Sequence, residues 1–214
     1  EAAYIIYQKF DQLDEALGVL LDHLKDWNRA TDFALRVNDP NVWRRLGVAQ
    51  LESCVIADGI TSLLRGQNAW EEHALVVRAS RENEEESGMA DWKAVIKFCT
   101  AARKMLWRKR RVAEGGGTVG GDMARAGVDS ELLFALCWLE RLTDVESFLG
   151  GRHAAEVEDV GDRCMTRGDK LRDETVAAAE NPASLVQPVA PARSIWEASR
   201  MLYAHVSVWH KLAK

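Results

Sequence analysis

The feature that most constrains the fold is a helical spacing of apolar residues that recurs along the whole chain. From Leu13 to Leu24 the apolar side chains fall three and four residues apart, which places them on one face of a helix. The same spacing returns over 27–37, 42–49, 56–64, 70–77, 92–106, 132–139, 142–149, 157–164 and 195–209, and more weakly over 169–179. The sequence contains no convincing strand pattern, so we predict an all-α protein.

Helix-breaking residues are rare and fall between these stripes. The prolines stand at positions 40, 182, 188 and 191, and Pro40 follows Asn38-Asp39, where it suits the first turn of a helix. Gly66 is predicted to end one helix and Asn68 to cap the next. About ten helices joined by short turns must pack as antiparallel neighbours. We therefore expect an α-solenoid, a rod-shaped right-handed superhelical zigzag of antiparallel helical hairpins.

Three segments interrupt the helical pattern. The stretch 81–88 is acidic, 114–127 is rich in glycine, and 182–194 contains Pro188 and Pro191. We expect each to be an exposed, mobile loop inserted between hairpins. Composition does not change across them, so residues 1–214 are predicted to form a single domain. The chain opens on Glu1 rather than Met and closes within a helical pattern, so we expect it to be a fragment of a longer chain.

Tryptophan and cysteine both point to a buried interior. Trp27, Trp43, Trp70 and Trp92 lie on predicted inward stripes, where truncation to Ala typically costs about 3 to 5 kcal/mol. The cysteines stand far apart without a C-x-x-C pair, and two of them fall on apolar stripes. We therefore expect core tryptophans and reduced thiols, with a cytoplasmic location. The cysteines are Cys54, Cys99, Cys137 and Cys164.

Composition and charge exclude several classes of function. The chain is 47% hydrophobic and 29% charged, which is typical of a folded soluble protein. Its net charge of -5 argues against nucleic acid or anionic lipid as a general partner. The longest strongly apolar run, Leu132 to Leu139, is far shorter than the roughly 20 residues that cross a bilayer.

The sequence also lacks the motifs of an enzyme. The glycine run at 115–121 follows a basic helix rather than a strand, so it does not fit a phosphate-binding loop. His73 and His153 have neighbouring glutamates but neither the H-E-x-x-H spacing nor a second histidine nearby in sequence, which indicates surface helix. We predict no catalytic residues, no metal site and no cofactor.

One basic cluster lies at the end of a predicted helix. Its members are Arg103, Lys104, Arg108, Lys109, Arg110 and Arg111. Cations at a helix C-terminus are stabilised by the macrodipole by roughly 0.3 to 1 kcal/mol each, so a solvated helix end is the simplest interpretation. A protein-contact surface is the main alternative, and a nuclear-import or anionic-surface motif is a weaker one.

Several runs of this sequence resemble the clathrin heavy-chain family. Their order and approximate spacing match the family over most of residues 1–170, and the resemblance fades afterwards. The runs are Glu1-Ala-Ala-Tyr-Ile-Ile-Tyr-Gln-Lys-Phe-Asp11, Asn28-Arg-Ala-Thr-Asp-Phe-Ala34, Asn38-Asp-Pro-Asn-Val-Trp43, Leu46-Gly-Val-Ala-Gln-Leu51, Glu131-Leu-Leu-Phe-Ala-Leu136 and Val160-Gly-Asp-Arg-Cys164. The sequence departs from the family at the three predicted loops and over 169–192.

The resemblance implies a structural role in the leg of a heavy chain. In that family three heavy chains join in a triskelion, legs interweave into the lattice of coated pits and vesicles, clathrin light chain lies along the proximal leg, and adaptors link the coat to the membrane. Two alternatives stay open: a related solenoid from a vacuolar-sorting or membrane-tethering complex, and a helical enzyme domain. An enzyme would be distinguished by a pocket with convergent ionisable groups.

Overall fold

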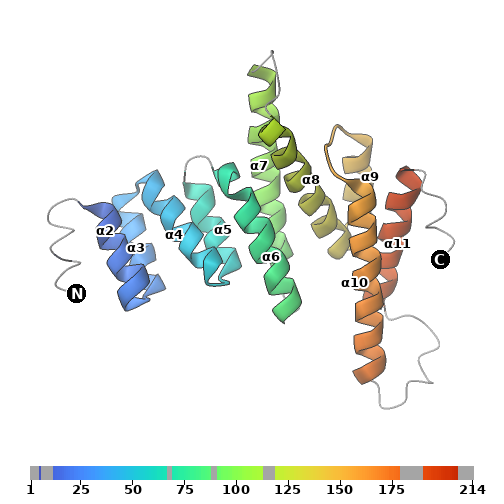
Figure 1. Ribbon diagram of the computed structural model, residues 1–214, viewed down its shortest axis with the longest axis horizontal. Coiled ribbons are helices and arrows are strands. Elements are labelled where there is room, and N and C mark those ends of the chain that lie inside the picture. The colour runs from blue at the N-terminus through green and yellow to red at the C-terminus, as the bar shows by residue number, and fades with distance from the viewer. Residues whose placement is uncertain are drawn as a thin grey trace. The chain divides into compact units, whose positions relative to one another are not determined.

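The computed structural model describes residue 5 and residues 12–66, 69–87, 91–112, 119–178 and 190–206. Every regular element in these ranges is helical, which confirms the all-α prediction (Figure 1). Two compact units divide the chain, Glu1–Met105 and Leu106–Lys214. The elements are α2 (Leu13–Gly18), the π-helix η1 (Val19–Leu24), α3 (Trp27–Val37), α4 (Pro40–Glu52), α5 (Ile56–Arg65), the 3-10 helix η2 (Ala69–Glu72), α6 (His73–Ser87), α7 (Trp92–Val112), α8 (Val119–Trp138), α9 (Leu142–Gly150), α10 (Val157–Ala178) and α11 (Ala190–His205).

Acidic caps fix the starts of the first helices. The Asp26 side chain accepts a hydrogen bond from the Arg29 backbone N–H at 3.0 Å, and Asp39 accepts from Asn41 at 2.8 Å. Pro40 occupies the first turn of α4, as predicted. Gly66 does end α5, but in an extended conformation with φ of -71° rather than a left-handed one. The predicted cap Asn68 lies outside the described residues.

The core of the first unit lies between α2, η1, α3 and α4. Leu17, Leu20, Phe33 and Leu46 are fully buried there, and Trp43 is 2% exposed. Trp92 on α7 is 3% exposed, so the predicted core position is confirmed for both of these tryptophans. Trp27 is half-buried and packs against this core, which agrees with the prediction. Trp70 is only half-buried, short of the core position predicted for it.

Helices α4 and α5 form an antiparallel hairpin whose backbones touch (Figure 1). A Cβ placed on Gly47 would lie 2.9 Å from the Gly59 carbonyl oxygen and 2.8 Å from Leu63 Cγ. A Cβ on Gly59 would lie 2.8 Å from Leu51 Cγ. Only glycine permits this approach, because real Cβ atoms do not come so close to a neighbouring backbone.

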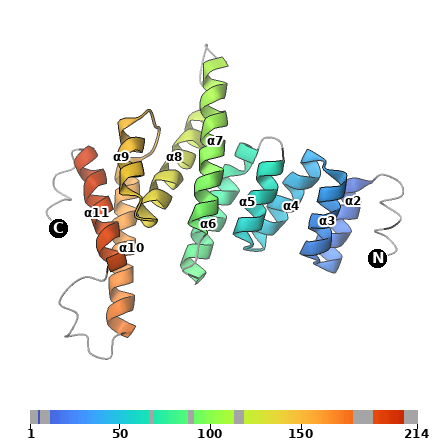
Figure 2. The ribbon, with the colours of Figure 1, turned by 180° about the vertical axis from the view of Figure 1, so that it is seen from behind.

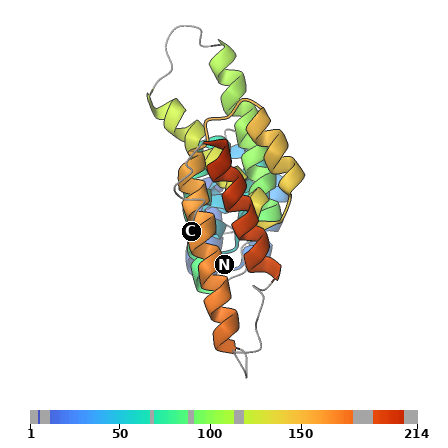
Figure 3. The same cartoon turned by 90° about the vertical axis from the view of Figure 1, so that its right-hand side faces the viewer.

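The second unit contains a hairpin of α10 and α11, which lie side by side (Figures 2 and 3). Tyr203 of α11 covers Gly161 near the start of α10, and Trp196 covers Gly168 farther along it, so the two helices run antiparallel. Ser199 donates a hydrogen bond to the Gly161 carbonyl at 2.9 Å. The Tyr203 hydroxyl donates to Asp162 at 2.6 Å.

A buried ion pair joins α8 to α10. Glu131 of α8 is completely buried and accepts a hydrogen bond from Arg163 Nη1 of α10 at 2.8 Å. The Arg163 guanidinium also lies 3.5 Å from the centroid of the Phe134 ring. Next to Glu131, Asp129 accepts from the Ala154 N–H at 2.8 Å. The family-like runs 131–136 and 160–164 therefore pack directly against each other.

The predicted loops differ from the structure in the described residues. Residues 81–87 continue α6, and residues 119–127 form the start of α8; loops were predicted in both places. Glutamate is a good helix former, and Arg78 faces Glu82 one turn away on α6. On α8, the packing of buried Ala124 overrides the poor helix propensity of the glycines nearby. Residues 88, 114–118 and 182–189 lie outside the described part, while 190–194 belong to α11.

Residues 157–164 and 169–178 form one continuous helix, α10, instead of the two that the sequence pattern indicated. Gly168 lies between the two predicted segments. In the structure it is a helical residue that makes room for the Trp196 ring of α11. Glycine serves close helix packing at this position rather than chain reversal.

Substituting Gly47 with Ala should destabilise the first unit. The new Cβ would force α4 and α5 apart, and overpacking of this kind typically costs about 1 to 3 kcal/mol, against a gain of about 1 kcal/mol from better helix propensity. Gly150→Ala is the matched control, because its Cβ would meet no atom within 4 Å. Urea unfolding followed by circular dichroism measures both. A Gly47→Ala variant as stable as Gly150→Ala would contradict the close backbone contact.

Substituting Arg163 with Leu should destabilise the second unit, because it leaves Glu131 charged and fully buried. Breaking a buried pair typically costs about 3 to 5 kcal/mol, and the lower end applies because the Arg163 side chain is 21% exposed. The double variant Glu131→Leu with Arg163→Leu should recover most of the loss. Arg172→Leu on the same helix removes an exposed pair with Asp173 and should have little effect. Equal thermal midpoints for the two single variants would refute the pair's importance.

Candidate protein-contact surface

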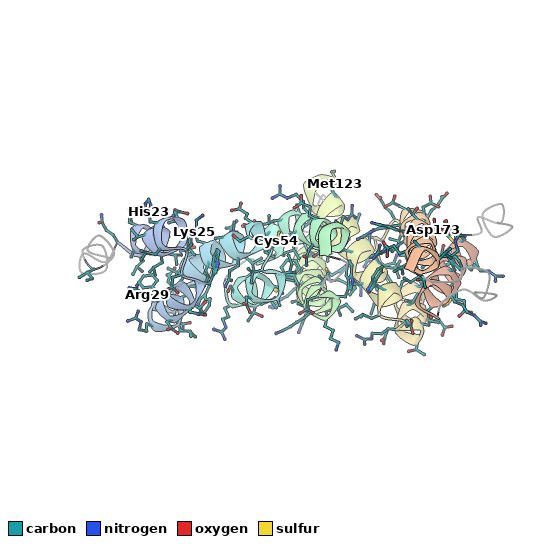
Figure 4. All side chains as sticks on the ribbon, turned by 90° about the horizontal axis from the view of Figure 1, so that it is seen from below. His23, Lys25, Arg29, Cys54, Met123 and Asp173 are labelled. Atoms are coloured by element: carbon teal, nitrogen blue, oxygen red, sulfur yellow. The ribbon has the colours of Figure 1, made fainter. Side chains whose placement is uncertain are left out.

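Histidine, cysteine and acidic side chains are spread over the described residues. Among them, no three histidine, cysteine or acidic side chains gather in a way that would hold a metal ion. None of the described helices combines the length and apolarity needed to span a membrane. Cys99, Cys137 and Cys164 are buried thiols, whereas Cys54 is exposed at the turn between α4 and α5 (Figure 4).

The predicted basic cluster does not form one surface. Lys104 and Arg108 are exposed on α7 and stand four residues apart, so they share a face of the helix. Arg103 is half-buried and points to a different side of α7. Residues 109–111 belong to the end of α7, and their side chains lie outside the described part.

Two further lysines, which the sequence pattern did not lead us to predict, complete the exposed face of α7. Lys93 and Lys97 are exposed and fall on the same side of the helix as Lys104 and Arg108. We call these four residues the basic stripe. The spacing of four, seven and four residues between these positions indicates in the sequence that they share one helical face. The more closely spaced cations at 103–111 predicted a cluster at the helix end instead. The opposite face holds Val95, Phe98, Ala102 and Leu106, all buried.

The basic stripe is not neutralised by its own helix. Helix α7 contains no aspartate or glutamate, so no i,i+4 partner of opposite charge is available. Within the described part of the chain, none of the four stripe residues forms an ion pair or a hydrogen bond through its side chain. The stripe is thus a line of solvated cations available to an acidic surface.

The last turns of α7 are held by an aromatic contact. The guanidinium groups of Arg125 and Arg152 lie 5.8 Å and 4.8 Å from the centroid of the Trp107 ring. Contacts of a cation with an aromatic face contribute about 0.5 to 2 kcal/mol each, more where they are desolvated. Arg125 is 6% exposed, so this contact is the desolvated one.

Arginine also anchors the first unit. Arg44 of α4 donates to Glu72 of η2 through Nε at 2.8 Å and lies 3.2 Å from Glu71. The hydrogen bond with Glu72, followed by the attraction of both carboxylates, raises the pKa of Arg44 above its ordinary value, so the group stays charged. These contacts hold η2 against α4. They also pair Glu71 and Glu72, the two glutamates that precede His73, with Arg44. The His73 ring lies 3.0 Å from the Trp70 carbonyl oxygen.

The structure places His153 differently from the prediction. It lies in the segment between α9 and α10, not on a helix, and its ring stacks on Phe148 with centroids 5.3 Å apart. His205, the last residue of α11, lies 6.0 Å from it between ring centroids. His205 stands 52 positions from His153 in the sequence, so no local pattern predicts their contact, which arises only from the α10–α11 hairpin.

Comparisons with known proteins agree with this architecture. The family model described as "Region in Clathrin and VPS" matches residues 1–54. Clathrin heavy chain 2 of Homo sapiens is 30% identical over 213 residues, which is 100% of this chain and 10% of that protein. Clathrin heavy chain 1 of Arabidopsis thaliana is also 30% identical over 213 residues, again 100% of this chain and 10% of its own length.

A third relative extends the comparison to another lineage. Clathrin heavy chain of Dictyostelium discoideum is 26% identical over 212 residues, which cover 99% of this chain and 10% of that protein. The chain therefore spans about a tenth of the length of the curated relatives it matches. Similarity of this extent, on a fold made of successive helical hairpins, shows that the chain belongs to the clathrin heavy-chain family, as a segment of clathrin-type repeats.

Proposed function

We propose that this chain is a structural scaffold segment in the leg of a clathrin heavy chain. It contributes to the triskelion and to the polyhedral lattice of coated pits and vesicles, on their cytoplasmic face, in intracellular protein transport and endocytosis. The observation that carries the proposal is similarity to clathrin heavy chains along the whole chain. A vacuolar-sorting or tethering role has no such support, since the named relatives are all clathrin heavy chains.

The proposed partners are other proteins rather than small molecules. Other heavy chains meet the segment through exposed helix faces, clathrin light chain lies along the leg, and the membrane is reached only through adaptors. The role is structural, with no catalytic step and no cofactor. Extended helix faces that carry charge suit contacts of this kind, because they offer many small interfaces instead of one deep pocket.

Weak individual contacts follow from this role. A lattice that must later come apart is best held by many small interfaces acting together. We therefore expect the isolated chain to be monomeric at micromolar concentration, while the full-length protein that carries it assembles. Sedimentation velocity of both proteins tests this expectation. A stable dimer of the isolated chain at that concentration would contradict it.

Charge reversal at the end of α7 tests whether this basic region contributes to the lattice. Arg108, Lys109, Arg110 and Arg111 are replaced by Glu in the full-length protein. Surface charges of this kind matter little to folding but alter the salt dependence of association. We expect an unchanged circular dichroism spectrum, weaker coat assembly and a changed dependence on salt, measured by sedimentation of coats.

Two results would count against these proposals in different ways. If the reversed protein builds coats with the salt dependence of the parent, the basic end is only a solvated helix terminus, and its contact role fails. If the unaltered full-length protein builds no coats under any condition that assembles its relatives, the scaffold proposal itself fails.

A further inference from the structure

Helix α10 carries a line of carboxylates that matches the basic stripe of α7. Glu158, Asp162 and Asp173 are exposed, and the Asp169 side chain is 50% exposed. We call these four residues the acidic stripe. They lie opposite Val160, Cys164 and the other residues that α10 buries. Asp173 is labelled on this helix in Figure 4.

The two stripes have the same spacing. The basic stripe runs 93, 97, 104 and 108, and the acidic stripe runs 158, 162, 169 and 173, so both step by four, seven and four residues. Each therefore spans about 22 Å along its helix at 1.5 Å per residue. The spacing reads the same in both directions, so four cations can face four carboxylates whether the helices run parallel or antiparallel.

The acidic stripe makes contacts within its own unit and is still exposed to solvent. Arg172 reaches Asp169 at 3.8 Å and Asp173 at 2.8 Å, and Tyr203 donates to Asp162. A carboxylate can accept several hydrogen bonds, so an exposed carboxylate can also meet a cation of a partner. The other three arginine and lysine side chains of α10 are Arg163, Arg167 and Lys170. Arg163 turns inward to Glu131, and Arg167 lies over the Trp138 ring and 3.6 Å from Glu174. Lys170 and Arg172 are exposed, but the four carboxylates of the acidic stripe outnumber them.

We propose that the basic stripe of α7 docks on the acidic stripe of α10 in a second copy of this chain. The inference rests on the proposed lattice role and names one of its contacts. The occupant is a second copy because the same sequence presents both halves with identical spacing. The two patches are different surfaces, so the contact is heterologous and each copy keeps one unused patch for a further copy. A contact that propagates in this way suits an extended lattice.

Two sets of substitutions in the full-length protein test the contact. The first reverses the basic stripe with Lys93→Glu, Lys97→Glu and Lys104→Glu; the second reverses the acidic stripe with Glu158→Lys, Asp169→Lys and Asp173→Lys. Asp162 is kept because it holds Tyr203, and Arg108 is kept because it belongs to the other charge-reversal test. The matched control changes three exposed cations outside the stripe. These are Lys25→Glu, Arg36→Glu and Arg200→Glu, none of which lies on α7 or α10.

Each reversed set should raise the concentration needed for coat assembly about tenfold or more at low salt, because like charges then face each other. The control should assemble like the parent. An equimolar mixture of the two reversed proteins should assemble again, because the acidic α7 of one meets the basic α10 of the other. Only an intermolecular contact gives that result. Circular dichroism melting curves check that every variant is folded.

Three results would overturn the inference while leaving the scaffold role intact. Reversed proteins that assemble like the parent would show that the stripes make no contact. A mixture that assembles no better than its components would show that the contact is not between copies, and equal losses in the control would show a general effect of net charge. If the unaltered protein builds no coats, the scaffold proposal fails, and this inference fails with it.

Discussion

An amphipathic helix can bury only one face, and much of the described structure depends on that constraint; α8 differs, because its residues 128–137 are all buried. Val95, Phe98 and Leu106 of α7 are removed from water, while Lys93 and Lys97 on the same helix remain solvated. A helix of this kind is stable only when a neighbour covers its apolar stripe. Hairpins such as α4–α5 and α10–α11 meet the requirement within each unit, and the exposed faces of their helices stay available for other contacts.

The contacts between helices are of two physical kinds. In the first unit, Gly47 and Gly59 let two backbones touch, so shape complementarity sets the distance between α4 and α5. In the second unit, a charged pair, Glu131 with Arg163, lies inside the packing between α8 and α10. A buried ion pair is a weak source of stability but a strict selector of register, because any slip would leave a buried charge without its partner.

The proposed function lies on the exposed faces of the helices, because the other faces are already buried against neighbouring helices. Contacts spread along helices, each weak by itself, fit a protein that assembles and comes apart, and they need no pocket. The stripes of opposite charge on α7 and α10 follow the same helical periodicity that places the apolar residues. Residues four, seven and eleven positions apart share one helical face, whether that face is buried or charged. Net charge alone conceals this organisation, because the cations and carboxylates stand on different helices.

The sequence alone determined the helical class, the position of most helices and the family resemblance, since apolar spacing and short motifs are local properties. It did not determine which glycine ends a helix and which serves packing: Gly66 and Gly168 look alike until the Trp196 ring is placed on one of them. Nor did it reveal that residues 119–127 are helical, or that His153 meets His205. Those features belong to the tertiary structure, because they depend on contacts between residues distant in sequence, and local propensity carries no information about such contacts.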